Sequence, residues 1–335
     1  MAKKQREWTP EQLMETMRGF QPACVIGAAL ELDVFGKLAR ADMTAAQAAR
    51  AIKGTARGAR ALLNALAALG LLTKRGEVFS LTPFARKHLV PDSPAYLGWG
   101  AMHSAHIMKS WTQIAECVRT GKPAPRPPAD SEAGKIRHKN FIMAMHNYAS
   151  DRSRIIAGSL NLEGVKTMLD VGGGPGTYAF AFADALPGAR ITIFDTPPTC
   201  AIADENIRQR GLQDRIRTQP GDFIKDPIGD GYDLVLMSNI LHIYSPAENT
   251  RLLKKGYRAL NPGGRLAVVE VEVDDTGTKP PGGALFAVNM LVNTERGSSY
   301  SPNEMKSWLA AAGFKTVKAA RPADGVTALI AAKPR

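Results

Sequence analysis

The sequence predicts a doubly wound Rossmann-like α/β domain preceded by an α-helical winged-helix domain. The first observation is a buried strand, residues 167–171, that leads into the glycine turn 172–176 and then into a helix from Thr177. The second is the regular alternation of short apolar runs with helical segments from about residue 165 onward. The third is the order helix, helix, hairpin over residues 44–81, which is typical of a winged helix.

Length and composition exclude several classes of protein. The chain has 335 residues, enough for two domains, and its 44% hydrophobic content is typical of a globular protein. Its start lacks the apolar stretch of a signal peptide, and no apolar run approaches the ~20 residues of a membrane helix. Three well-separated cysteines indicate a reducing compartment and have no metal-binding spacing. We therefore expect a cytoplasmic protein with no membrane span and no metal.

The net charge of +12 is concentrated in the first half of the chain. Residues 1–160 carry 23 Lys and Arg against 12 Asp and Glu, whereas residues 161–335 carry 20 against 19. Nucleic acid, an anionic substrate or simply a soluble surface would each account for the basic half. A winged-helix DNA-binding regulator is one alternative. However, residues 55–69 offer few polar side chains for reading bases, so nucleic acid is the less favoured partner.

Helix start signals place the N-terminal elements. Thr9 and Thr44 each begin a capping box that ends in a glutamine three residues later. We expect a helix over residues 9–31 that restarts at Pro22. Further predicted elements are helices over 44–52 and 55–69 and a hairpin of residues 71–73 and 78–81.

The rest of the chain is predicted to form helices, followed by strands and helices in alternation. Two helical stretches, 95–120 and 133–160, flank a proline-rich linker at 121–129. Ser245 and Ser301 each begin another capping box and therefore a helix. The predicted strands of the α/β domain are residues 167–171, 190–194, 216–219, 233–237, 264–273, 314–319 and 325–332.

The glycine turn indicates a nucleoside cofactor. Gly172, Gly174 and Gly176 can adopt positive φ angles and let the backbone approach a ligand closely. Their spacing departs from the G-x-G-x-x-G turn that binds a pyrophosphate. Asp195 ends the next strand, where a carboxylate can accept both ribose hydroxyl protons. A tight turn without a ligand and a nicotinamide site are the alternatives.

Polar residues follow two further strands at the same edge of the sheet. Asp222 and Phe223 follow the third strand, where they could meet an adenine ring or simply form a turn and a core contact. His242 lies after the fourth strand. An imidazole there can take up the proton of a hydroxyl as the oxygen attacks, and a structural histidine is the alternative.

With these residues in this order, the sequence resembles the small-molecule S-adenosylmethionine-dependent O-methyltransferases, a family that includes caffeic-acid, acetylserotonin and bacterial tailoring enzymes. The likeness covers most of the chain. It implies a winged-helix dimerisation domain at 1–95, a helical connector and pocket wall at 96–160, and a class I methyltransferase domain at 161–335. It also implies S-adenosyl-L-methionine as cofactor, a homodimer, and a small aromatic or apolar acceptor with a hydroxyl group.

The resemblance also assigns roles to single residues. It makes His242 the general base and Glu270 the first of two flanking glutamates, whereas the second aligns near Ser299, with Glu295 as the nearest carboxylate. Plant members have a second glutamate beside the histidine, and this sequence departs from them there. A thiol or carbon atom as the methyl acceptor is therefore an alternative. The implied cofactor-binding residues are Gly172, Gly174, Asp195, Asp222, Phe223 and Ser238. The implied walls of the acceptor pocket are Phe141, Met145 and Met290.

Overall fold

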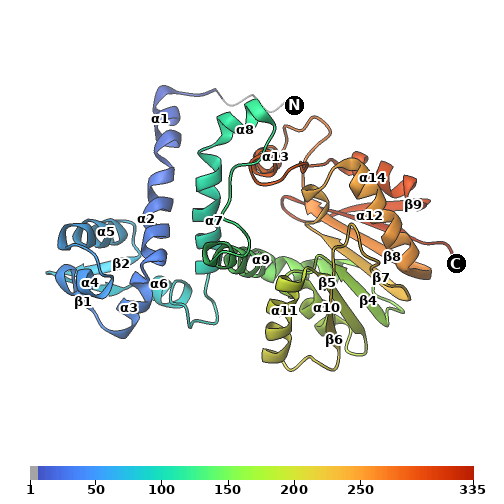
Figure 1. Cartoon of the computed structure of the whole chain (residues 1–335), viewed down its shortest axis with the longest axis horizontal. Helices are drawn as coiled ribbons and strands as arrows, with labels where there is room; N and C mark the ends of the chain where they lie inside the picture. Colours follow the sequence, from blue (N-terminus) through green and yellow to red (C-terminus); the bar gives the residue numbers. More distant parts are fainter. Residues whose placement is uncertain (1–6) are drawn as a thin grey trace. The chain divides into compact units, whose positions relative to one another are not determined.

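The computed structural model describes residues 7–335 of the chain, which divides into two compact units, residues 1–108 and 109–335. The boundary falls inside helix α7 (Gly98–Trp111). Figure 1 traces the first unit from blue to teal and the second from teal-green to red.

The first unit contains the predicted pair of helices and the hairpin. Its three short strands pair antiparallel in the order β1-β3-β2. Both predicted capping boxes are present, at Thr9 and Thr44, but the first helix breaks at Gly19 and not at Pro22. The elements are α1 (Pro10–Arg18), α2 (Phe20–Glu31), α3 (Val34–Arg40), β1 (Met43–Thr44), α4 (Ala45–Ala51), α5 (Ala56–Ala68), β2 (Leu72–Arg75), β3 (Val78–Leu81) and α6 (Pro83–His88).

The second unit contains a seven-stranded sheet and the helices around it. The predicted helix over 95–120 is in fact two helices, because the chain turns at residues 112–113. The helices are α8 (Ile114–Thr120), α9 (Glu132–Ser159), α10 (Thr177–Ala185), α11 (Pro197–Gln209), α12 (Pro246–Ala259), α13 (Pro281–Asn293) and α14 (Pro302–Ala311). The strands are β4 (Thr167–Val171), β5 (Arg190–Asp195), β6 (Ile216–Pro220), β7 (Tyr232–Ser238), β8 (Leu260–Val271), β9 (Thr316–Ala323) and β10 (Val326–Ala332).

The sheet confirms the doubly wound prediction and has a topological switch point at its centre. The strand order is β6-β5-β4-β7-β8-β10-β9, and β10 runs in the direction opposite to the other six strands. The chain winds outward from β4 in one direction and then returns to add β7 on the other side. Ligands bind beyond the carboxyl ends of strands at such a switch point. The segments that follow β4 and β7 are the glycine turn and the segment of His242.

Helices cover both faces of this sheet, as Figure 1 shows. One core cluster joins the sheet to α12 and α14, and the other joins it to α9, α10 and α11. The central strands are apolar along their whole length because both faces are buried. Among residues 7–335 no helix is both long enough and apolar enough to cross a membrane. In the same residues no three His, Cys, Asp or Glu side chains gather as a metal site.

The capping box of α12 provides a test of the local structure. The Ser245 hydroxyl accepts from the Glu248 amide and donates to the Glu248 carboxylate. We expect Ser245→Ala to lower the free energy of unfolding by about 1 kcal/mol, because the first turn loses its cap. Urea denaturation measures the loss, and Ser307→Ala, an exposed change inside α14, is the control. Equal stability of the two variants would contradict the capping assignment.

Candidate active site

The glycine turn after β4 leaves room for a ligand. Gly172, Gly174 and Gly176 have φ angles of 69°, 56° and 88°, which other residues adopt only with strain. A Cβ on Gly176 would lie 2.9 Å from the Phe180 ring, whereas a Cβ on Gly174 would meet nothing within 4 Å. The turn is therefore packed on its protein side and open on the other, as a cofactor that approaches the backbone requires.

Asp195 is bound to this turn. Its Oδ2 accepts from the Gly174 amide at 2.9 Å and its Oδ1 from the Thr196 amide at 2.7 Å. The side chain is buried, and burial raises its pKa, although the two amides oppose the shift. Each carboxylate oxygen can accept more than one hydrogen bond, so ribose hydroxyls can still be bound. The structure thus brings Asp195 and Gly174 together, as the sequence predicts for a nucleoside site.

A second buried carboxyl lies beneath the turn. Asp170, in β4, is 1% exposed and its Oδ2 has no hydrogen-bond partner among the described residues. Burial and the nearby charge of Asp195 raise the pKa of Asp170 to about 7. Near neutral pH a large part of the population therefore carries a proton on Asp170, which reduces its repulsion from Asp195.

Helix α9 adds two histidines that sequence reasoning missed. The His146 ring lies 2.9 Å from the Thr177 hydroxyl at the start of α10, and the His138 ring lies 3.4 Å from the Thr199 hydroxyl in α11. Burial lowers the pKa of both rings, so both are neutral at physiological pH. These contacts hold α9 against the N-terminal ends of α10 and α11, beside the turn. Met145 is seven residues from His138 and therefore lies on the same face of α9.

The segment after β6 holds Asp222 and Phe223 in a turn of its own. Asp222 Oδ1 accepts from the amides of Ile224 (2.9 Å) and Lys225 (3.2 Å), and Phe223 packs in the core edge-on to Tyr244. The outer carboxylate oxygen of Asp222 is 3.3 Å from the Lys225 ammonium. Contact of either residue with an adenine ring stays a prediction.

Lys255 fastens this turn to α12. Its ammonium donates to the carbonyl oxygens of Phe223, Ile224 and Asp226 at 3.0, 2.6 and 2.8 Å. Burial lowers its pKa, whereas the charges of Asp222 and Asp226 raise it. Nothing in the sequence indicates this role, because the lysine is about thirty residues from the turn that it binds.

His242 and Glu270 form the central pair of the site. His242 lies in a short 3-10 turn, Leu241–Ile243, and Glu270 in β8. The imidazole Nδ1 is 2.7 Å from Glu270 Oε2, and the two side chains are 12% and 5% exposed. Oε1 of the same carboxylate accepts from the amides of Ile240 and Leu241 at 2.9 and 2.7 Å. Since an ionised carboxylate can only accept, Nδ1 donates and Nε2 carries the free lone pair.

Neither candidate for the second glutamate contacts the imidazole. The Ser299 hydroxyl donates to the Gly283 carbonyl at 2.8 Å, and Glu295 is an exposed side chain next to Arg296. Among residues 7–335, Glu270 is the one carboxylate that forms an ion pair with His242. The ring also meets Phe286 of α13 in an edge-to-face arrangement, with ring centroids 4.8 Å apart.

The segment before Ser299 holds the backbone of His242 instead. The Ser298 amide donates to the His242 carbonyl at 3.0 Å. A Cβ on Gly297 would lie 2.2 Å from the same oxygen, so no larger residue fits there without movement. Arg296 anchors this segment through a 2.7 Å ion pair with Glu248 at the start of α12. The position of His242 is therefore restrained through its ring and through its main chain.

The remaining predicted residues have diverse environments. Ser238 ends β7 as a buried hydroxyl that accepts from Asn239 at 3.0 Å. Met290 is buried on α13, whereas Phe141 is 38% exposed and Met145 is half-buried on α9. Contact of Ser238 with the cofactor, and of Phe141, Met145 and Met290 with an acceptor, stays a prediction.

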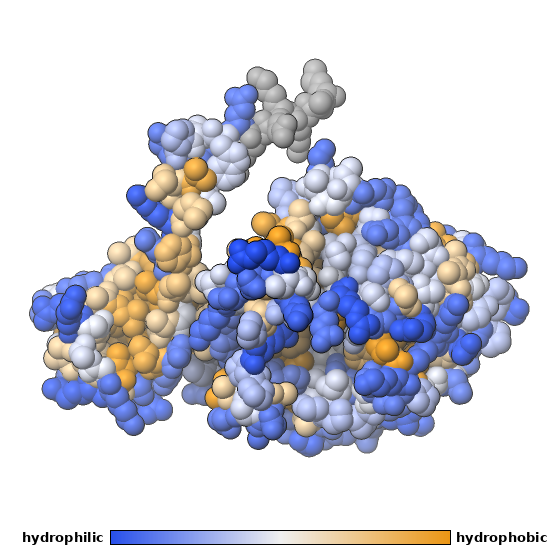
Figure 2. All heavy atoms as spheres, turned by 45° about the horizontal axis from the view of Figure 1, so that its top comes forward, coloured by the Kyte–Doolittle hydropathy of each residue, from blue (hydrophilic) through white to orange (hydrophobic). Residues whose placement is uncertain are grey.

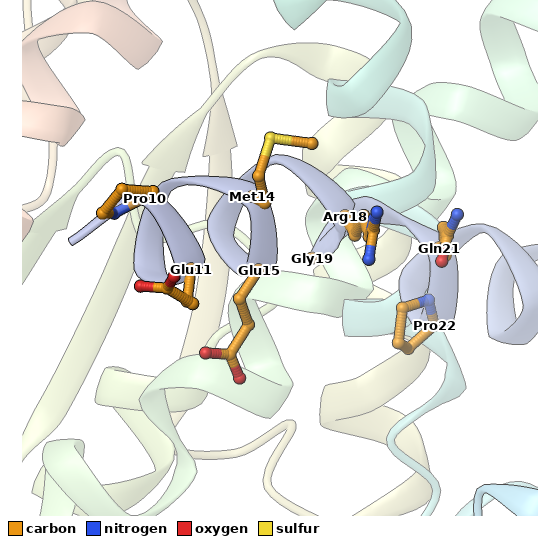
Figure 3. Close-up of a pocket in the computed structure, with 8 residues that line it drawn as sticks. All are labelled: Pro10, Glu11, Met14, Glu15, Arg18, Gly19, Gln21 and Pro22. Carbon is orange, nitrogen blue, oxygen red and sulfur yellow. The ribbon is translucent and has the colours of Figure 1, made fainter.

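The N-terminal unit has a shallow pocket of its own. It is lined by residues from 10–22 in α1 and the start of α2, which Figure 3 labels. None of the predicted site residues lines it. Figure 2 shows apolar side chains gathered on the surface of this unit. The large exposed ones are Trp8, Leu13, Met14, Met17, Phe20, Leu32, Leu69, Val78, Phe84 and Leu97.

The buried carboxyl of Asp170 provides a test by pH. Its folded pKa of about 7 lies above the ordinary value of 3.8, so the folded state binds a proton that the unfolded state has lost. The wild type should therefore lose stability, relative to Asp170→Asn, as pH rises from about 4 to about 7. The expected change is on the order of 4 kcal/mol in the free energy of unfolding, measured with urea. Parallel pH curves for the two proteins would refute the shift.

Two models of protein families match the chain. Residues 130–315 match the O-methyltransferase domain, and residues 14–91 match the O-methyltransferase dimerisation domain. The first match alone covers more than half of the chain and contains every residue of the glycine turn and of the His242–Glu270 pair. The second supports a homodimer formed through the N-terminal domain, where the exposed apolar side chains gather.

Individual relatives agree with these matches. The chain is 35% identical to the 3-hydroxy-5-methyl-1-naphthoate 3-O-methyltransferase of Streptomyces sahachiroi, over 95% of this chain and 94% of that protein. It is 30% identical to the tetracenomycin polyketide synthesis 8-O-methyl transferase TcmO of Streptomyces glaucescens, over 97% of each. The crystal structure of human N-acetylserotonin methyltransferase with S-adenosylmethionine superposes with a TM-score of 0.85 at 26% identity, over 99% of this chain and 100% of that one. The chain therefore belongs to the family of S-adenosylmethionine-dependent O-methyltransferases that act on small molecules.

Proposed function

We propose that His242 is the general base that takes the proton from a hydroxyl of an aromatic acceptor during methyl transfer. The observation that carries this proposal is the 2.7 Å contact between His242 Nδ1 and Glu270, which leaves the lone pair of Nε2 for the acceptor. The relatives named above support an aromatic acceptor, because their names specify a naphthoate, a polyketide and N-acetylserotonin.

The reaction needs little from the protein besides position and proton transfer. S-adenosyl-L-methionine supplies the methyl group when bound. As the acceptor oxygen attacks, Nε2 of His242 takes its proton, and the charge of the resulting imidazolium is stabilised by the Glu270 carboxylate. The site is partly desolvated, which favours a step in which a negative oxygen and a positive sulfur neutralise each other.

The open side of the glycine turn supports the proposed cofactor residues. Asp195 would accept the ribose hydroxyls, and Asp222 would accept from the adenine amine beside Phe223. The full proposed set for the cofactor is Gly172, Gly174, Asp195, Asp222, Phe223 and Ser238. The proposed acceptor walls are Phe141, Met145 and Met290, on α9 and α13.

The broader assignments are proposals of the same kind. The proposed domains are a dimerisation domain at 1–95, a connector and pocket wall at 96–160 and a catalytic domain at 161–335. The match to residues 14–91 supports the first, and the match to residues 130–315 covers most of the third together with residues 130–160 of the proposed connector. The three cysteines are unpaired, which supports a cytoplasmic location.

The role of His242 is tested by its removal. We expect His242→Ala to lower kcat for a phenolic acceptor by roughly 10²- to 10⁴-fold, because the hydroxyl proton has no nearby acceptor. Affinity for S-adenosylhomocysteine, measured by calorimetry, should stay the same, since the ring is not among the proposed cofactor residues. Glu270→Gln should give a smaller loss, because the ring keeps a partner but its cation is less stabilised. Full turnover by His242→Ala on an identified phenol would show that the base lies elsewhere.

Lys255 provides a test of the adenine-side turn. We expect Lys255→Met to weaken S-adenosylhomocysteine binding roughly tenfold, because three carbonyl groups lose a charged donor and the turn loosens. The kcat at saturating cofactor should change little, because Lys255 contacts neither His242 nor Glu270. Lys254→Met, at the exposed neighbouring position of the same helix, is the matched control. Equal affinity of the two variants would show that the turn does not need its anchor.

A further inference from the structure

The turn that carries His242 is held through its main chain as well as through its ring. The His242 carbonyl accepts a hydrogen bond from the Ser298 amide at 3.0 Å. Two residues later, the Tyr244 carbonyl accepts from the Tyr300 hydroxyl at 2.6 Å. Both donors belong to one segment, residues 294–300, which lies between α13 and α14. We call residues 294–300 the brace.

The brace is itself fixed along its length. At its start, the Thr294 hydroxyl donates to the Met290 carbonyl in the last turn of α13 at 2.7 Å and accepts from the Gly297 amide at 2.9 Å. In its middle, Arg296 forms a 2.7 Å ion pair with Glu248 of α12. Its last residue directly precedes the capping box that starts α14. The donors to the turn therefore lie on a segment that is tied to three helices.

The Tyr300 side chain is packed so that its hydroxyl has a fixed direction. It is 8% exposed, and its ring lies edge-on to Trp308 of α14, with ring centroids 4.8 Å apart. Burial, with smaller contributions from neighbouring carboxylates, raises the pKa of its hydroxyl to about 12, so the group stays a donor at physiological pH. Asn249 Nδ2 also approaches the Tyr244 carbonyl, but at 3.4 Å, so Tyr300 makes the shorter contact.

Glu270 and the brace hold opposite ends of the turn. Glu270 accepts from the amides of Ile240 and Leu241, which precede His242. The brace donates to the carbonyl groups of His242 and Tyr244, at and after the proposed base. A general base must lie within hydrogen-bond reach of the proton that it takes, and a displacement of about 1 Å can lower the rate roughly 10²-fold. The position of Nε2 therefore depends on both ends of the turn.

We propose that Tyr300 is a positioning residue for the proposed base, and that it acts through the Tyr244 carbonyl to keep His242 Nε2 within reach of the acceptor hydroxyl. The brace thus adds a restraint through the main chain to a ring whose one ion-pair partner among residues 7–335 is Glu270. The expected effect on catalysis rests on the proposed function, whereas the expected effect on the mobility of the turn does not.

The first experiment removes the Tyr300 hydroxyl and leaves the ring. Tyr300→Phe keeps the contact with Trp308 and loses the donor to the Tyr244 carbonyl. We expect it to lower kcat for a phenolic acceptor roughly tenfold, with little change in KM for the acceptor or in affinity for S-adenosylhomocysteine. The matched control is Tyr257→Phe, because Tyr257 packs edge-on to Phe314 against the same core cluster. This control should keep the kcat of the wild type.

The second experiment asks whether Tyr300 acts through His242. Once the base has been removed, a group that only positions it has no further effect. Tyr300→Phe should therefore not lower the remaining kcat of His242→Ala. A general loosening of the fold would instead lower kcat by the same factor in both backgrounds, and that result would overturn the inference. A kcat of Tyr300→Phe equal to that of the wild type would overturn it as well.

The third experiment follows the turn without methyl transfer. Amide hydrogen exchange of the full chain, measured by mass spectrometry, should be faster in peptides that cover residues 240–245 of Tyr300→Phe than in those of the wild type or of Tyr257→Phe. Unchanged exchange in these peptides would contradict the proposed contact. Full turnover by His242→Ala would instead overturn the proposed function, and the exchange result would be unaffected.

Discussion

The site depends on one carboxylate that joins two strands. Glu270 projects from β8 and accepts from the His242 ring and from two amides in the segment after β7. With one side chain, the fold holds the turn that carries the imidazole and selects its tautomer. A buried carboxylate with three donors is stable where an unpaired one would be costly. The same contacts therefore support both the structure and the proposed chemistry.

The parallel sheet places this pair near the cofactor turn. Because β4 and β7 are neighbours and run in the same direction, the segments that follow them emerge at one edge. The glycine turn follows β4, and the His242 segment follows β7, so residues about seventy positions apart in sequence border one crevice. Helices α9 and α13 then complete the site with His138, His146 and Phe286.

Apolar side chains lie beside the His242 ring. Phe286 packs edge-on to the His242 ring, and Met290, four residues later on α13, is buried. The dimerisation domain gives a separate reason for exposed apolar surface, on the N-terminal unit.

The sequence by itself determined the strands and the capping boxes at Thr9, Thr44, Ser245 and Ser301, because these features depend on neighbouring residues. It also determined the order of the glycine turn, Asp195 and His242 along the chain. Two helix boundaries differed from the prediction. The break at Gly19 and the division of residues 95–120 into two helices depend on packing. Only the tertiary structure decided that Glu270 holds the His242 ring and two backbone amides at once, that Lys255 anchors the turn of Asp222, and that His138 and His146 of α9 contact α11 and α10. Those contacts join residues that no short-range pattern relates, since the folded sheet and its helices bring them within bonding distance.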